Sequence, residues 1–230
     1  MILSRFDDAA TAAAALAEQV IGALQQGLAA RGAGSLVLAG GRTPLPLFHA
    51  LRDAALDWSR VGITLTDERW VDESDAASNA ALLRSALLGG RAADARFIPL
   101  HDGSPGAAGA AGAAWQRLQA LPRPFDAVVL GMGEDGHFAS LFPGNAGLSA
   151  ALDPKSEPAC VAMQAPAAPA ERLSLNLAAL AQTRRLFLLV SGELKHELLL
   201  RATRGGTGPE LPVSALLALR QPLPEVFWSR

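Results

Sequence analysis

The sequence predicts an α/β fold in three layers, in which helices cover both faces of a mostly parallel central sheet. Two observations support this prediction. Four short runs of β-type apolar residues each end in a glycine-rich or polar turn, and a helix-like stretch follows each turn. Strands that alternate with helices at this spacing form βαβ units and pair in parallel. Ligands of such sheets bind at the carboxyl ends of the strands, so we expect the functional residues in the turns.

The predicted elements follow one another along the chain without interruption. Residues 8–31 form the first expected helix, with Asp7 or Asp8 as its N-cap and Gly32 just past its end. Its aliphatic residues recur every four positions, at Leu16, Val20, Leu24 and Leu28. The strand-like runs are residues 35–39, 61–65, 127–130 and 186–190, and residues 226–228 are a candidate for a last strand. We expect a loop and a helix over 103–114 and a surface connection over 165–170.

Composition indicates a single domain with a sizeable core. Half of the 230 residues are hydrophobic and only 18% are charged, against about 25% in ordinary soluble proteins. No linker interrupts the strand-turn-helix pattern, so we expect residues 1–230 to form one domain. The net charge of -2 and the lack of like-charge blocks argue against nucleic acid as a partner.

The location expected from the sequence is the cytoplasm. The amino terminus has no cationic region before an apolar core, and no run of about 20 apolar residues could span a bilayer. A single cysteine, Cys160, excludes an intramolecular disulfide and lies in an apolar run, so we expect a buried thiol. No cluster with metal-ligand spacing is present, so neither a metal nor a cofactor is expected.

The turns after the first two strands are candidates for ligand binding: the first favours anions and the second carries charged side chains. The turn Gly40, Gly41, Arg42, Thr43 brings backbone N–H groups to a helix that starts near Pro44, although any strand-to-helix turn has similar composition. Asp67, Glu68 and Arg69 follow the next strand, where solvated loop charges are an adequate alternative interpretation. Downstream, Ser78 and Asn79 open a helix and most simply cap it.

The turn after the third strand has the strongest signal for catalysis. It has three glycines within residues 131–136, one of them Gly133, which suits close approach of the backbone to a ligand. His137 is the natural general base, and Asp135 could orient it or balance its charge. The other histidines have structural interpretations: His49 and His196 fall on helical stretches and His101 in a short connection.

Two further cations are candidates for phosphate contacts. Lys195 lies in the first turn of the helix expected over 193–201, where a cation opposes the helix dipole unless an anion is bound nearby. A lysine that extends to solvent is the alternative interpretation. Arg172, at the start of residues 172–176, is by itself indistinguishable from a surface arginine.

These segments, taken in order, resemble the 6-phosphogluconolactonase family. The resemblance covers nearly the whole chain and rests on residues 39–44, 67–71, 78–79, 131–143, 172–176 and 192–195, of which 131–143 is highly specific. It implies a Rossmann-like fold shared with glucosamine-6-phosphate deaminases and hydrolysis of 6-phospho-glucono-1,5-lactone in the pentose phosphate pathway. Arg42, where the family often has serine, and the acidic segment 72–75, where it often has histidine, depart from the pattern.

The resemblance also implies a role for each candidate residue. His137 would be the base, and Asp67 and Arg69 would lie near the lactone end; whether Asp135 or Asp67 is the partner of His137 stays open. The phosphate would contact Arg172, Lys195 and the turn of Gly40, Gly41 and Thr43, with Asn79 and Gly133 as further substrate contacts. Arg42, which departs from the family pattern, is an additional candidate for a phosphate contact. We expect water to attack directly, because the chain lacks a nucleophile-elbow serine.

Two other functions remain open at this point. One is an amino-sugar-phosphate isomerase or deaminase, whose loop usually continues from the histidine toward Asn-Glu-Pro, whereas this chain continues with Phe138-Ala139-Ser140-Leu141-Phe142-Pro143. The other is a sugar-phosphate-binding regulator without catalysis, which would have no need of His137. The expected partner is a small phosphorylated sugar lactone, with no nucleic acid or membrane, and the expected state is a monomer or a weak homo-oligomer.

Overall fold

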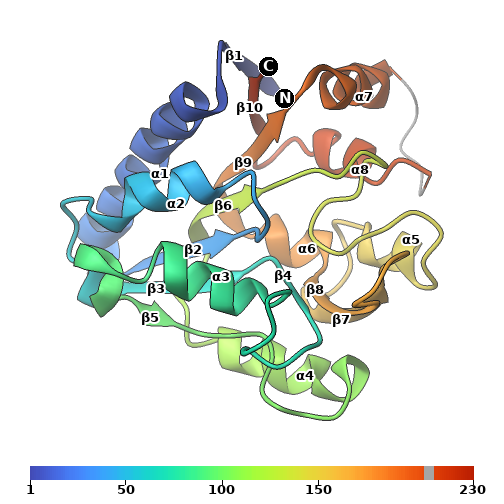
Figure 1. The fold of residues 1–230 in the computed structure, drawn as a ribbon, viewed down its shortest axis with the longest axis horizontal. Helices are drawn as coiled ribbons and strands as arrows, with labels where there is room; N and C mark the ends of the chain where they lie inside the picture. The colour runs from blue at the N-terminus through green and yellow to red at the C-terminus, as the bar shows by residue number, and fades with distance from the viewer. Residues whose placement is uncertain (205–209) are drawn as a thin grey trace.

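A parallel β-sheet forms the centre of the computed structural model (Figure 1), which describes residues 1–204 and 210–230. Its strands are β1 (Ile2–Phe6), β2 (Gly34–Leu38), β3 (Val61–Leu65), β5 (Arg96–Phe97), β6 (Phe125–Leu130), β9 (Thr183–Ser191) and β10 (Glu225–Ser229). Their order across the sheet is β1-β10-β9-β6-β2-β3-β5, and each neighbouring pair is parallel. The predicted strands and the predicted parallel pairing are therefore confirmed.

Helices surround this sheet. They are α1 (Ala9–Arg31), α2 (Leu45–Arg52), α3 (Asn79–Ala86), α4 (Ala107–Leu118), α5 (Leu148–Ala151), α6 (Leu177–Leu180), α7 (Glu193–Arg204) and α8 (Val213–Leu217), with short 3₁₀ turns at Trp58–Arg60 and Gly90–Asp94. The connections from β1 through β2 and β3 to β5 cross the sheet in one direction, and those from β5 through β6 and β9 to β10 return. Because such crossovers are right-handed, α1, α2 and α3 lie on the opposite face from α7 (Figure 1).

Helix α1 begins and ends where its sequence predicts. The Asp8 carboxylate accepts a hydrogen bond from the Thr11 N–H at 2.7 Å, and Gly32 follows the helix in the left-handed conformation with φ of 73°. Leu16 and Leu24 are fully buried against the sheet. Among the described residues, none of the helices is both long and apolar enough for a membrane crossing.

A small antiparallel sheet, which the sequence did not predict, lies beside the main one. It consists of β4 (Asp67–Arg69), β8 (Glu171–Leu175) and β7 (Cys160–Gln164), in the order β4-β8-β7. The alternative interpretation of solvated loop charges is therefore wrong for Glu68, which is a strand residue with only 1% of its surface exposed. Residues 165–170 connect β7 with β8, as expected for a surface connection, and Cys160 is buried as predicted.

Neighbouring strands β2 and β6 mark the point where the strand order reverses. The chain leaves β2 toward β3 on one side and leaves β6 toward β9 on the other, so the two connections diverge from the carboxyl ends of this pair. The Ala39 N–H donates to the Val129 carbonyl at 2.9 Å and continues the ladder to that edge. Ligands of open α/β sheets bind at such a reversal, and the turns after both strands meet there.

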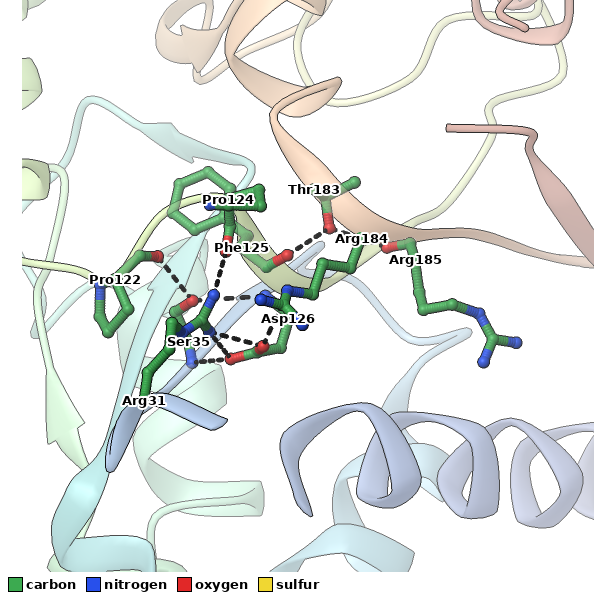
Figure 2. Close-up of polar contacts among 9 residues, drawn as sticks. All are labelled: Arg31, Ser35, Pro122, Pro124, Phe125, Asp126, Thr183, Arg184 and Arg185. Atoms are coloured by element: carbon green, nitrogen blue, oxygen red, sulfur yellow. Dashed lines mark hydrogen bonds and ion pairs between the residues drawn. The ribbon is translucent and has the colours of Figure 1, made fainter. Parts of the chain in front are cut away.

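A buried carboxylate holds the opposite end of the same two strands together (Figure 2). Asp126, on β6, is fully buried and accepts hydrogen bonds from Arg31 Nη2 at 2.6 and 2.7 Å and from the Ser35 N–H at 2.8 Å. Burial raises the pKa of the Asp126 carboxyl, and the donors from Ser35 and Arg31 oppose that effect. Because Arg31 ends α1 and Ser35 belongs to β2, this carboxylate joins the helix and both strands.

Two glycines of α1 are expected to respond in opposite ways to alanine. A Cβ on Gly27 would lie 2.3 Å from an oxygen of Asp126, whereas a Cβ on Gly22 would meet nothing within 4 Å. We expect Gly22→Ala to raise the free energy of unfolding by about 0.5–1 kcal/mol through helix propensity. We expect Gly27→Ala to lower it by about 1–3 kcal/mol, because overpacking displaces the carboxylate. Urea unfolding of both variants measures this, and equal effects would contradict it.

Candidate active site

A cleft of about 300 Å³ opens at the carboxyl ends of β2 and β6. It is lined by Ala39, Gly40, Gly41, Arg42, Thr43, Pro44, Asp67, Arg69, Asn79, Gly131, Met132, Gly133, His137, Ala139, Phe142 and Arg172. The structure thus brings together most residues that the sequence proposed for the site. Of the others, neither Asp135 nor Lys195 is a lining residue, but Asp135 contacts His137, which is one.

The glycine turn after β2 forms one wall of the cleft. Gly41 has φ of 94°, in the left-handed region that glycine tolerates best. Gly40 has no room for a side chain, since a Cβ there would lie 2.0 Å from Asn79 Oδ1. Helix α2 starts after Pro44 and has no side-chain cap; the Leu45 N–H donates to the Arg42 carbonyl at 3.2 Å, and Pro46 has no N–H to offer a ligand.

Asp135 holds the His137 ring in a defined orientation. One Asp135 oxygen lies 2.5 Å from His137 Nδ1 and also accepts the His137 backbone N–H at 3.0 Å. Burial raises the pKa of Asp135, but the hydrogen bonds from His137 outweigh it, so the pKa lies below its usual value and the group is a carboxylate. A carboxylate on Nδ1 favours the tautomer with its proton there and leaves Nε2 as the basic nitrogen.

Gly133 allows this ring to pack against the backbone. A Cβ on Gly133 would lie 2.2 Å from His137 Nδ1, and the ring centroid of Phe142 lies 4.2 Å from that of His137 on another side. The glycine that the sequence assigned to substrate contact therefore has a packing role as well. A larger residue at this position would force the imidazole away from Asp135.

Asp67 is fixed by hydroxyl groups and does not contact the histidine. Thr66 Oγ1 donates to one of its oxygens at 2.8 Å and Ser140 Oγ donates to the other at 2.6 Å. Of the two carboxylates, Asp135 is thus the one that contacts His137 in the structure. Sequence reasoning missed Ser140, which is fully buried; the signal was a lone hydroxyl in the apolar run 138–143.

Two arginines lie opposite each other on neighbouring strands of the small sheet. Arg69 on β4 is the register partner of Arg172 on β8. Arg172 is only 9% exposed, its guanidinium bonds to no group within residues 1–204 and 210–230, and its Nε is buried. Burial and the nearby Arg69 charge lower the pKa of Arg172. Like charges opposite each other are unfavourable, and a bound anion would relieve that repulsion.

Lys195 belongs to the same sheet edge but not to the cleft lining. It is half-buried and lies in the first turn of α7. The helix begins directly after Gly192, whose φ is 93°. The helix that the sequence predicted over 193–201 is confirmed by α7. Among the described residues, no group of three or more His, Cys, Asp or Glu side chains could hold a metal ion.

A family model and the sequences of known proteins indicate the same protein family. Residues 7–228 match the model of the glucosamine-6-phosphate isomerases/6-phosphogluconolactonase family. The chain is 44% identical to the 6-phosphogluconolactonase of Pseudomonas aeruginosa, with 98% of this chain and 94% of that protein aligned. It is 39% identical to the enzyme of that name from Rhizobium meliloti, with 97% of each chain aligned.

Solved structures extend the comparison to the fold. A 6-phosphogluconolactonase crystal structure from Shewanella baltica has a TM-score of 0.94 and 40% identity, covering 100% of this chain and 98% of that one. A monomeric glucosamine-6-phosphate deaminase, at 18% identity and a TM-score of 0.79, shares the fold and covers 100% of this chain and 98% of its own. By sequence and by fold, the chain belongs to the glucosamine-6-phosphate isomerase/6-phosphogluconolactonase family.

Proposed function

We propose that this protein hydrolyses 6-phospho-D-glucono-1,5-lactone to 6-phospho-D-gluconate in the oxidative pentose phosphate pathway. Its near relatives assign the enzyme class, which is 6-phosphogluconolactonase. The observation that carries the residue roles is the pairing of His137 with Asp135 beside a cleft whose arginines make no ion pair within residues 1–204 and 210–230. A base and a group of cations in one cleft suit an ester whose remote end is a phosphate.

His137 acts as the general base in this proposal. Its Nε2 takes a proton from a water molecule, whose oxygen attacks the lactone carbonyl carbon and forms a tetrahedral intermediate. The Asp135 carboxylate stabilises the imidazolium that results. When the intermediate collapses, the bond from the carbonyl carbon to the ring oxygen breaks, and the imidazolium returns its proton to that oxygen. The products are a hydroxyl and a carboxylic acid, which releases its proton to solvent and becomes a carboxylate, so atoms and charge balance.

The cations at this edge of the sheet, those of the cleft and Lys195 beside it, have two roles in the proposal. Arg69 or backbone N–H groups of the glycine-rich loop stabilise the oxyanion. Arg172, Lys195 and the turn from Gly40 to Thr43 hold the phosphate, with Arg42 adding a charge at the exposed rim. Binding energy from the phosphate then orients the lactone, which is the usual use of a remote charged group in catalysis.

An assay of two reactions tests the proposal. The purified protein is mixed with freshly made 6-phosphogluconolactone, with spontaneous hydrolysis subtracted, and in parallel with glucosamine 6-phosphate. We expect accelerated lactone hydrolysis and no ammonia release from the amino sugar. Ammonia release would favour the isomerase or deaminase alternative, and binding without acceleration of either reaction would favour a regulator.

Removal of the phosphate-binding cations is expected to discriminate between substrates. Arg172→Ala and Lys195→Ala should each lower kcat/KM for the phosphorylated lactone by roughly ten- to a hundredfold, because a charge-assisted hydrogen bond contributes roughly 1.5–3 kcal/mol. Turnover of unphosphorylated gluconolactone should stay nearly unchanged. Arg91→Ala, an exposed arginine outside the cleft, is the matched control. Equal losses on both substrates would remove these residues from the phosphate site.

Replacement of the base is expected to abolish catalysis but not binding. His137→Asn keeps a similar size and should lower kcat/KM by about 10²–10⁴-fold, the usual contribution of a general base. In the wild type, kcat/KM should fall toward acid pH along one ionisation, because the base acts only when neutral. Titration calorimetry should show 6-phosphogluconate binding retained, and His49→Asn, at an exposed position of α2, is the control. Near-full activity of His137→Asn with an unchanged acid limb would make Asp67 the next candidate.

A further inference from the structure

Asn79 presents a buried acceptor to the cleft. It is the first residue of α3, is 3% exposed and lines the cleft. Its Nδ2 donates to the main-chain carbonyl of Asp67 at 3.0 Å, which fixes the amide orientation, since a flipped amide would place two acceptors together. Its Oδ1 is buried and has no hydrogen-bond partner among the described residues.

The chemistry around this oxygen differs from that of the rest of the cleft. The arginines of the cleft are donors and suit an anionic oxygen, whereas Asn79 Oδ1 requires a donor. A buried acceptor left without a donor is unfavourable, so a ligand that donates there gains over one that does not. A sugar hydroxyl is such a donor. Gly40 keeps the approach open, because a Cβ at that position would lie 2.0 Å from Oδ1.

A buried carboxylate sets the position of Asn79. Glu68 Oε1 accepts the Asn79 N–H at 2.7 Å and the Arg69 N–H at 2.8 Å. Glu68 Oε2 accepts the Ala80 N–H at 2.7 Å and the Ser78 hydroxyl at 3.3 Å. The side chain makes no ion pair within the described residues, so its negative charge is balanced by the amino-terminal N–H groups of α3. It ties the start of this helix to strand β4.

We propose that Asn79 Oδ1 accepts a hydrogen bond from a hydroxyl of the sugar portion of the ligand, and that Glu68 is a positioning residue that acts through Asn79. The pair would select a polyhydroxylated phosphate over a bare phosphate. This inference rests on the proposed function, since the hydroxyl belongs to a sugar phosphate. It assigns a specificity role to a carboxylate that never touches the ligand.

The test compares two ligands across four proteins. Dissociation constants for 6-phosphogluconate and for inorganic phosphate are measured on the wild type, Asn79→Ala, Glu68→Gln and the double variant. We expect Asn79→Ala to weaken 6-phosphogluconate about tenfold, as for one hydrogen bond to a buried group, and to leave phosphate unchanged. Glu68→Gln replaces one acceptor oxygen by an N–H₂ that faces helix donors, and should weaken 6-phosphogluconate severalfold.

Non-additivity separates positioning from general destabilisation. If Glu68 acts through Asn79, Glu68→Gln should have no further effect on 6-phosphogluconate binding in the Asn79→Ala protein. Ser78→Ala, which removes one hydrogen bond to Glu68 and the cap on the Ala81 N–H, is a milder second variant with the same expected pattern. It keeps the test usable should Glu68→Gln fail to fold, as monitored by thermal melting.

Each remaining outcome overturns a distinct statement. Unchanged 6-phosphogluconate binding in Asn79→Ala, or equal weakening of both ligands, would overturn the hydroxyl contact. Additive losses in the double variant would overturn the positioning role of Glu68. Wild-type protein that binds phosphate but not 6-phosphogluconate would overturn the proposed function together with this inference, and so would be distinguishable from the other failures.

Discussion

The parallel pairing of β2 with β6 is the constraint on which both ends of the molecule depend. At the amino ends of these strands, Asp126 on β6 accepts from Ser35 on β2 and from Arg31 at the end of α1 (Figure 2). At their carboxyl ends, the Gly40 turn and the His137 loop become the two walls of one cleft. A change of register between these strands would separate the base from the turn and would break the buried ion pair at the same time.

At both ends of this strand pair, several positions require glycine because a side chain packs against the backbone there. Gly40 makes room for Asn79, Gly133 for the His137 ring and Gly27 for the Asp126 carboxylate. In each case a polar side chain occupies the volume that a Cβ would fill, so packing rather than backbone flexibility requires glycine. The flexibility argument holds for Gly41, whose φ of 94° lies in the left-handed region.

Buried carboxylates are stabilised here in three different ways. An arginine pairs with Asp126, hydroxyls from Thr66 and Ser140 hold Asp67, and the amino terminus of α3 holds Glu68. In the cleft, Arg172 Nε and Asn79 Oδ1 are buried without a hydrogen-bond partner in the part of the chain that the structure describes, and the same holds for nitrogen atoms of Arg31, Arg123 and His196 elsewhere. Arg172 and Asn79 differ from these in lining a cleft, where a ligand can reach them.

The sequence by itself determined the parallel sheet, helix α1, the buried Cys160 and the two turns that line the cleft, because apolar periodicity and capping act over short stretches of chain. It also identified the candidate base from a local run of glycines before His137. Only the tertiary structure showed that Asp135, and not Asp67, contacts that histidine, and only it buried Glu68 and Arg172. The burial of Glu68 and Arg172 depends on the pairing of β4 with β8, far apart in the chain, and local patterns carry no information about which distant strand will cover a charge.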